Sequence, residues 1–183
     1  MSLFRTLQHS PATLTIFHDA TIPLSNILYK ALSRAHFNLK DNSKHEFQID
    51  LMQNKMPTLD QYQSLVRNCL PDSRSKSILH GCYPFLHDRR TSGSSHSEIV
   101  TTRGLGHHRG VGHQFTHHKT FSEGEYSIIY DAFNKLHEGK ATGKVDIEPS
   151  EIFRAPLVVD WDQNKIANDE ESLVEILQKY TAE

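Results

Sequence analysis

Two cysteines are the residues best suited to covalent chemistry in this chain. Cys82 lies in the stretch HGCYPFLHDRR, residues 80–90, among histidines and arginines. Positive neighbours stabilise a thiolate, which is the form of cysteine that attacks disulfides and peroxides. The pattern predicts a one-cysteine redox centre if this loop lies over the end of a sheet. The alternative interpretation is a loop thiol with no chemical role.

Cys69 is the second candidate nucleophile. Its spacing places it late in a helix and on a partly buried face. A helix C-terminus destabilises a thiolate, and a buried free cysteine ordinarily packs as a small hydrophobic residue. Cys69 and Cys82 are 13 residues apart and form no Cys-X-X-Cys pair. Two cysteines also exclude a disulfide scaffold and a four-cysteine zinc site.

A run of five histidines is the densest group of potential metal ligands. Neutral imidazoles bind Zn, Cu or Ni, but the spacing matches no structural zinc motif and no cysteine or carboxylate stands nearby. We therefore predict no physiological metal site, and the pattern is typical of a solvated low-complexity insert. The five residues are His107, His108, His113, His117 and His118.

Length and charge exclude several classes of protein. The chain has 183 residues, which suits a single domain over residues 1–183. A net charge of −2 gives no overall attraction to nucleic acid. No apolar run reaches the roughly 18 residues that a membrane helix needs, so neither a nucleic-acid nor a membrane partner is expected.

The N-terminal residues allow two interpretations. Residues 1–18 contain Arg5 and no acidic residue, and Asp19 is the first carboxylate. Mitochondrial presequences are basic and poor in acids. Residues 1–10 are therefore either a short targeting segment or an ordinary polar N-terminus.

Residues 71–120 differ in composition from the rest of the chain. They contain 8 of the 13 histidines and 6 of the 9 glycines, with seven basic residues against three acidic ones. Such a segment buries too little apolar surface to offset the entropy of ordering it. We predict a long, disordered His/Gly/Ser-rich insertion, so the flanking parts must form one fold together.

The flanking parts show alternating and helical patterns. Strands are predicted at residues 13–17, 46–51, 157–161 and 165–167, because β-branched and alternating apolar residues fill them. Helices are predicted at 25–35, 58–69, 122–138 and 168–180, with a short helix at 149–153. The caps predicted for the four longer helices are Ser25, Thr58, Ser122 and Asn168, with Gly139 ending the third.

This order of elements predicts an α/β fold. It reads β-α-β-α, then the insertion, then α-β-β-α, which favours a parallel first pair of strands and a C-terminal antiparallel hairpin. That is the topology of the thioredoxin-like fold. Pro156 stands directly before the hairpin, where that fold carries a cis-proline.

Three stretches, in order, resemble a known family. They are MSLFRTLQ at residues 1–8, PTLDQYQ at 57–63 and VDW at 159–161. They look like the fungal "found in mitochondrial proteome" family of proposed redox proteins. Residues 16–19 and 155–160 also resemble the arsenate-reductase-like branch of the thioredoxin superfamily. The resemblance implies a thioredoxin-like fold, a mitochondrial location and redox activity.

The sequence departs from these families where their chemistry resides. Thr21 and Ile22 occupy the turn that holds the nucleophilic cysteine in arsenate-reductase-like proteins. Ala155 precedes Pro156, and Arg154 stands one position before the family's arginine. The stretch 126–148, where the fungal family has its proposed redox cysteine, contains none. By resemblance, Thr21, Ile22, Arg154 and Pro156 would line the substrate groove; alternatively, Pro156 only shapes the turn.

Two functional hypotheses follow. The first is a mitochondrial thioredoxin-like redox protein that reduces a thiol-linked or small-molecule substrate through Cys82 or Cys69. It would need no bound cofactor, with glutathione as a candidate reductant. The second is a catalytically inactive thioredoxin-like binding module. Neither hypothesis identifies a protein partner.

Overall fold

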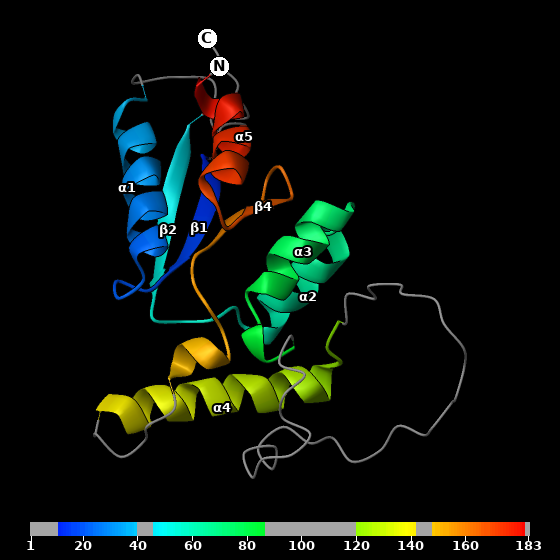
Figure 1. Cartoon of the computed structure of the whole chain (residues 1–183). Helices are drawn as coiled ribbons and strands as arrows, with labels where there is room; N and C mark the ends of the chain where they lie inside the picture. The colour runs from blue at the N-terminus through cyan, green and yellow to red at the C-terminus, as the bar shows by residue number, and fades with distance from the viewer. Residues whose placement is uncertain (1–10, 40–45, 87–119, 142–147, 182–183) are drawn as a thin grey trace, which may run out of the picture.

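A computed structural model of the chain describes residues 11–39, 46–86, 120–141 and 148–181. It contains a four-stranded mixed sheet in the order β2-β1-β3-β4 (Figure 1). The strands are β1 Ala12–His18, β2 Phe47–Gln53, β3 Leu157–Asp160 and β4 Lys165–Ala167. The helices are α1 Pro23–Phe37, α2 Leu59–Asn68, α3 Ser73–Gly81, α4 Glu123–Ala141 and α5 Glu170–Thr181, with short 3₁₀ turns η2 Pro84–Leu86 and η4 Pro149–Glu151.

The pairing of the strands follows the order predicted from the sequence. β1 and β2 are parallel, with Ala12 paired to Phe47 and His18 to Gln53. β3 is antiparallel both to β1 and to β4. The two distant parts of the chain therefore share one sheet, and the prediction of a mixed α/β fold is confirmed.

Helices cover both faces of the sheet because its inner strands are apolar on both sides. Leu14 and Ile16 of β1 face α1 and α5, whereas Phe17 faces the other core. Figure 1 shows α1 and α5 side by side on one face, α2 and α3 on the other, and α4 across the end of the sheet. None of the helices in these described segments is both long and apolar enough to cross a membrane.

The caps of α2 and α4 are those that the sequence predicted. Thr58 and Gln61 form a reciprocal capping box at α2, with distances of 2.9 and 3.3 Å. Ser122 and Glu125 do the same at α4, where the Ser122 amide donates to Glu125 Oε2 at 2.9 Å. Gly139 does not end α4, which continues to Ala141.

Two other predicted caps are wrong. α1 begins at Pro23, and Ser25 lies inside its first turn with its side chain buried. At α5 the capping residue is Asp169, not Asn168, because Asp169 Oδ1 accepts from the Ser172 amide at 2.7 Å. This bond is also the largest contribution to the lowered pKa of Asp169.

The predicted insertion starts too early at residue 71. Residues 73–86 form α3 and η2, with Asp72 capping α3 through the Ser75 amide at 2.8 Å. The segment orders because Ile78, Leu79 and Tyr83 enter the core. The rest of the predicted insertion up to residue 119, like the targeting segment at 1–10, lies outside the described residues.

The β3–β4 hairpin is held by one buried carboxylate. Asp160 is fully buried and accepts hydrogen bonds from the amides of Asp162 and Gln163 at 3.0 and 2.9 Å. Its other oxygen accepts from Gln163 Nε2 at 2.6 Å and from the Tyr180 hydroxyl at 2.7 Å. A buried carboxylate requires such partners, and these tie the turn to the end of α5.

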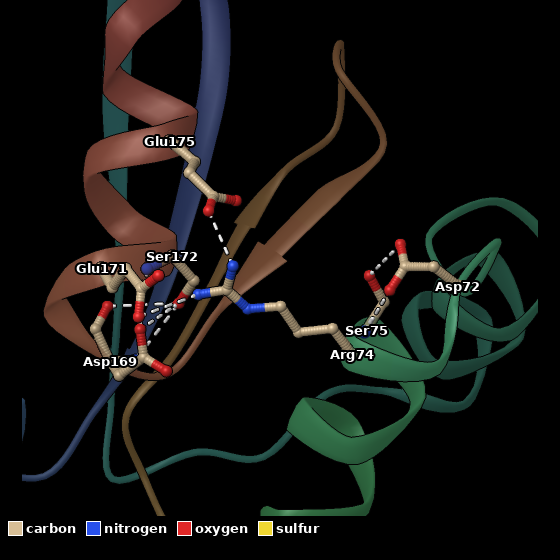
Figure 2. A network of polar contacts seen from close by, with 7 residues as sticks. All are labelled: Asp72, Arg74, Ser75, Asp169, Glu171, Ser172 and Glu175. Atoms are coloured by element: carbon tan, nitrogen blue, oxygen red, sulfur yellow. Dashed lines mark hydrogen bonds and ion pairs between the residues drawn. The ribbon is translucent and has the colours of Figure 1, made fainter.

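The short edge strand β4 is enclosed by the helices on its two sides. Both α3 and α5 contact β4. Figure 2 shows Arg74 reaching from α3 to the acidic residues of α5. Its Nη1 lies 2.7 Å from Glu175 Oε1, and its Nη2 lies 3.6 Å from Glu171 Oε2. These ion pairs join α3 to α5 beside β4, the edge strand on this side of the sheet.

Replacing the Asp160 carboxylate by an amide tests its role. We expect Asp160→Asn to lower the free energy of unfolding by about 1–3 kcal/mol, because an NH₂ group then faces buried donors. Urea denaturation followed by circular dichroism measures the change. Asp162→Asn, at an exposed neighbouring position, is the matched control and should be near neutral. Equal losses in the two variants would contradict this account of the turn.

Candidate functional site

The candidate site lies at the end of the sheet where β1 passes into α1. Phe17 of β1 is paired with Leu157 of β3, so Pro156 stands beside the last residue of β1. The Ala155–Pro156 peptide bond is cis, as the topology predicted. The loop 19–22 that follows β1 therefore begins at the same end of the sheet as Pro156.

Local hydrogen bonds shape this loop. Asp19 Oδ1 accepts from the Thr21 amide at 2.8 Å and from the Thr21 hydroxyl at 2.7 Å. Asn26 Nδ2 donates to the carbonyl of Ala20 at 2.8 Å. Thr21 is exposed and Ile22 half-buried, so both predicted groove residues of this loop reach the surface. The loop offers a hydroxyl and an apolar side chain, but no thiol.

A buried histidine and serine fix the loop from beneath. The Nδ1 atom of His18 lies 2.7 Å from the Ser25 hydroxyl oxygen, which also accepts from the Asp19 amide at 3.1 Å. The His18 ring packs on Tyr29 at 5.2 Å between centroids. His18 is 6% exposed and Ser25 0%. The His18–Ser25 pair is therefore buried beneath the loop and holds it in place. This pair was not predicted from the sequence. The pattern that indicates it is a histidine at the end of a strand followed by a serine in the next helix.

The second side of the site comes from the segment before β3. Arg154 is exposed, and its amide donates to the carbonyl of Cys82 at 2.9 Å. The structure thus brings Arg154, Pro156 and the backbone of Cys82 together. The condition set for a redox role of Cys82, that its stretch lies at the end of the sheet, is therefore met by its backbone.

The Cys82 thiol has the opposite character to that expected. It is 1% exposed, and its Sγ donates to the Ile78 carbonyl at 3.4 Å. Burial raises the pKa of Cys82 to about 12. The expectation of a lowered pKa is therefore wrong, because burial removes the thiol from water and disfavours the thiolate. Catalysis by Cys82 stays a prediction, and it requires the thiol to become exposed first.

Cys69 is also buried, at the C-cap of α2. Burial, and secondarily the charge of Asp160, raise the pKa of Cys69 to about 11. Both cysteines are free thiols. Cys69 packs among core residues as a small hydrophobic side chain, and a catalytic role for it also stays a prediction.

Cys82 and Cys69 belong to a buried core cluster that is rich in aromatic side chains. Tyr62 stacks on Tyr126 at 4.2 Å between centroids, and the hydroxyls of Tyr83 and Tyr126 lie 3.2 Å apart. Burial is the main cause of the raised pKa of Tyr83 and of Tyr126. The cluster is a packed core that keeps water from the thiols.

Within the described segments, no group of three or more histidine, cysteine or acidic residues lies close enough to hold a metal ion. The five-histidine run at 107–118 lies outside those segments.

Residues 4–169 match the family model described as "Protein of unknown function (DUF1687)". The chain belongs to the DUF1687 family. The family description names no activity, so the redox function drawn from the resemblance stays a prediction. No curated protein and no solved structure matches this DUF1687 member.

Burial predicts slow thiol labelling in the folded protein. At pH 8 we expect an aromatic disulfide reagent to label neither thiol rapidly, since neither forms a thiolate at that pH. Both should react at once in denaturant. Absorbance of the released chromophore measures the rate. Rapid labelling of the folded chain that disappears in Cys82→Ser would contradict the buried position of Cys82.

The same pKa values predict a pH dependence of stability. An ordinary thiol has a pKa of 9.0, whereas that of folded Cys82 is about 12. The protonated thiol therefore contributes its full stability below pH 9 and loses it as pH rises toward 12. Cys82→Ala should flatten the decline in the free energy of unfolding between pH 8.5 and 10.5, measured by urea titration at each pH. An unchanged slope would show that this thiol does not contribute.

Proposed function

We propose that this protein is a thioredoxin-like binding module that recognises an extended thiol compound of the glutathione class without turning it over. The recognition surface consists of the side chains of Thr21, Ile22 and Arg154 together with the backbone beside Pro156, whose own side chain is buried. One observation carries the proposal: the loop after β1 exposes Thr21 where arsenate-reductase-like proteins, which the sequence resembles, have a nucleophilic cysteine, while both cysteines are buried.

The arrangement of the strands supports the thioredoxin-like part of the proposal. A sheet in the order β2-β1-β3-β4 has a parallel β1–β2 pair and an antiparallel β3–β4 hairpin followed by α5. Each of these features belongs to the thioredoxin topology. In that fold, the loop after the first strand and the backbone beside the proline meet extended thiol-bearing molecules.

The chemistry of the surface supports the ligand class. Arg154 is an exposed cation that can pair with a carboxylate of the ligand, and the Thr21 hydroxyl, which donates to Asp19 Oδ1, can still accept a hydrogen bond from a ligand N–H group. The half-buried apolar side chain of Ile22 follows Thr21 in the sequence. A short, acidic, extended peptide such as glutathione offers matching groups.

A redox function through Cys82 is the second candidate. It is favoured by the hydrogen bond from the Arg154 amide to the Cys82 carbonyl, which ties this cysteine to the same end of the sheet. The thiolate would attack a disulfide, forming a mixed disulfide that a second thiol such as glutathione then releases. A mitochondrial location, drawn from the fungal resemblance, is part of both candidates.

S-methylglutathione separates binding from turnover, because its sulfur cannot exchange. In nuclear magnetic resonance titrations we expect shifts of the Thr21, Ile22 and Arg154 amides. Arg154→Ala should weaken binding roughly two- to fivefold, the effect of losing an exposed ion pair. Arg34→Ala, at the far end of α1, is the matched control and should leave binding unchanged.

Two results would contradict the binding proposal. Absence of amide shifts at millimolar ligand would refute the binding module for this class. Turnover of glutathione disulfide that Cys82→Ser abolishes and Cys69→Ser retains would establish the redox candidate instead.

A further inference from the structure

The two edges of the sheet are protected to different degrees. β4 has three residues and lies under the Arg74 bridge between α3 and α5 (Figure 2). β2 has seven residues and pairs with β1 in an unbroken register. It contains no proline, lysine, arginine or bulge, which are among the devices that prevent pairing at an exposed edge, and its one charged residue is Asp50. In the described part of the chain, no strand pairs with its outer side.

The outward-pointing backbone groups of β2 can be assigned. The Ala12 amide donates to the Glu46 carbonyl at 2.9 Å, and the Asn54 amide donates to the His18 carbonyl at 2.8 Å. Backbone groups alternate in direction along a strand. The backbone amides and carbonyls of the even-numbered residues of β2 therefore point toward β1. Those of Phe47, Ile49 and Leu51 point away from β1, toward the outer side of the edge.

We propose that β2 is a self-association edge, at which two copies of the chain pair antiparallel about a two-fold axis through Ile49. In this register Ile49 pairs with itself and Phe47 pairs with Leu51 of the second copy. The backbone amides and carbonyls of all three residues point outward, so those of one copy can form hydrogen bonds with those of the other. The result is one continuous sheet across both copies.

Side chains select this register over its neighbour. With the axis at Ile49, Gln48 lies opposite Asp50 of the second copy, and the amide can donate to the carboxylate. With the axis at Asp50, two carboxylates would face each other at the closely spaced kind of pair, which is destabilising. Leu51, now 39% exposed, lies opposite an aromatic partner in the first register.

A second copy fits this edge better than an unrelated strand. The match between Gln48 and Asp50 is reciprocal, so the same strand supplies both halves of it. Asp50 already accepts from the Thr15 hydroxyl at 3.2 Å, and its position on this face is therefore fixed before association.

Charge changes at position 48 test the proposal without altering the core. Gln48→Lys and Gln48→Glu both lose the hydrogen bond from Gln48 Nε2 to the Thr13 hydroxyl at 3.1 Å, so they are matched for the loss of that bond. Because residues 48 and 50 share a face of β2, the new charge also acts on Asp50 of the same copy, in the monomer as in the dimer. In the dimer, lysine at position 48 places a positive charge opposite the Asp50 carboxylate of the second copy. Glutamate at position 48 places a second negative charge there. We expect the dimer dissociation constants of the full chains to differ on the order of tenfold, with lysine tighter. Analytical ultracentrifugation over a concentration series measures them.

Hydrogen exchange of the unmodified protein gives an independent readout of the register. The Ile49 and Leu51 amides should exchange more slowly as concentration rises, whereas the Asp50 amide, which points to β1, should not change. A chain that stays monomeric at millimolar concentration overturns the proposal. So does a dimer that is insensitive to position 48, or a monomer whose Ile49 and Leu51 amides are already protected, since another part of the same chain would then cover the edge.

Discussion

The central strand β1 requires a partner on each of its two edges, and the rest of the structure depends on this requirement. Leu14, Ile16 and Phe17 are buried, and buried backbone amides and carbonyls must be hydrogen-bonded. β2 satisfies one edge from nearby in the chain. The other partner, β3, is distant in sequence. The indole N–H of Trp161, directly after β3, donates to the hydroxyl of Thr15, which is 146 residues away.

The return of β3 also creates the candidate site. Because Leu157 is paired with Phe17, the residues before β3 reach the loop after β1. The same segment anchors the end of α3 through the Arg154 amide and the Cys82 carbonyl. Cys82 is brought to the site by its backbone while its side chain turns into the aromatic core. The position of Cys82 and the reactivity of its thiol are thus separate properties, which is why we propose recognition rather than thiol chemistry.

Features that depend on local pattern were predictable from the sequence, and those that depend on tertiary packing were not. The strands, the Thr58 capping box and the place of Pro156 follow from short-range spacing. Asn168 and Asp169 are equally good caps, and only the geometry of α5 selects the second. The ordering of α3 was missed because its few apolar residues stand among serines and histidines. The pKa of Cys82 depends on burial by aromatic residues distant in sequence.

The two proposals concern different atoms of the sheet and do not depend on each other. Recognition at the end of β1 uses the side chains of Thr21 and Arg154, which belong to connections between elements. Association at β2 uses backbone groups of a strand one position further out in the sheet order. In a continuous sheet of two copies, α1 and α5 would cover the same face of the sheet in each copy as they do in the monomer. Pairing at the edge of the sheet does not require any helix to move. Each dimer would therefore carry two recognition surfaces related by the two-fold axis.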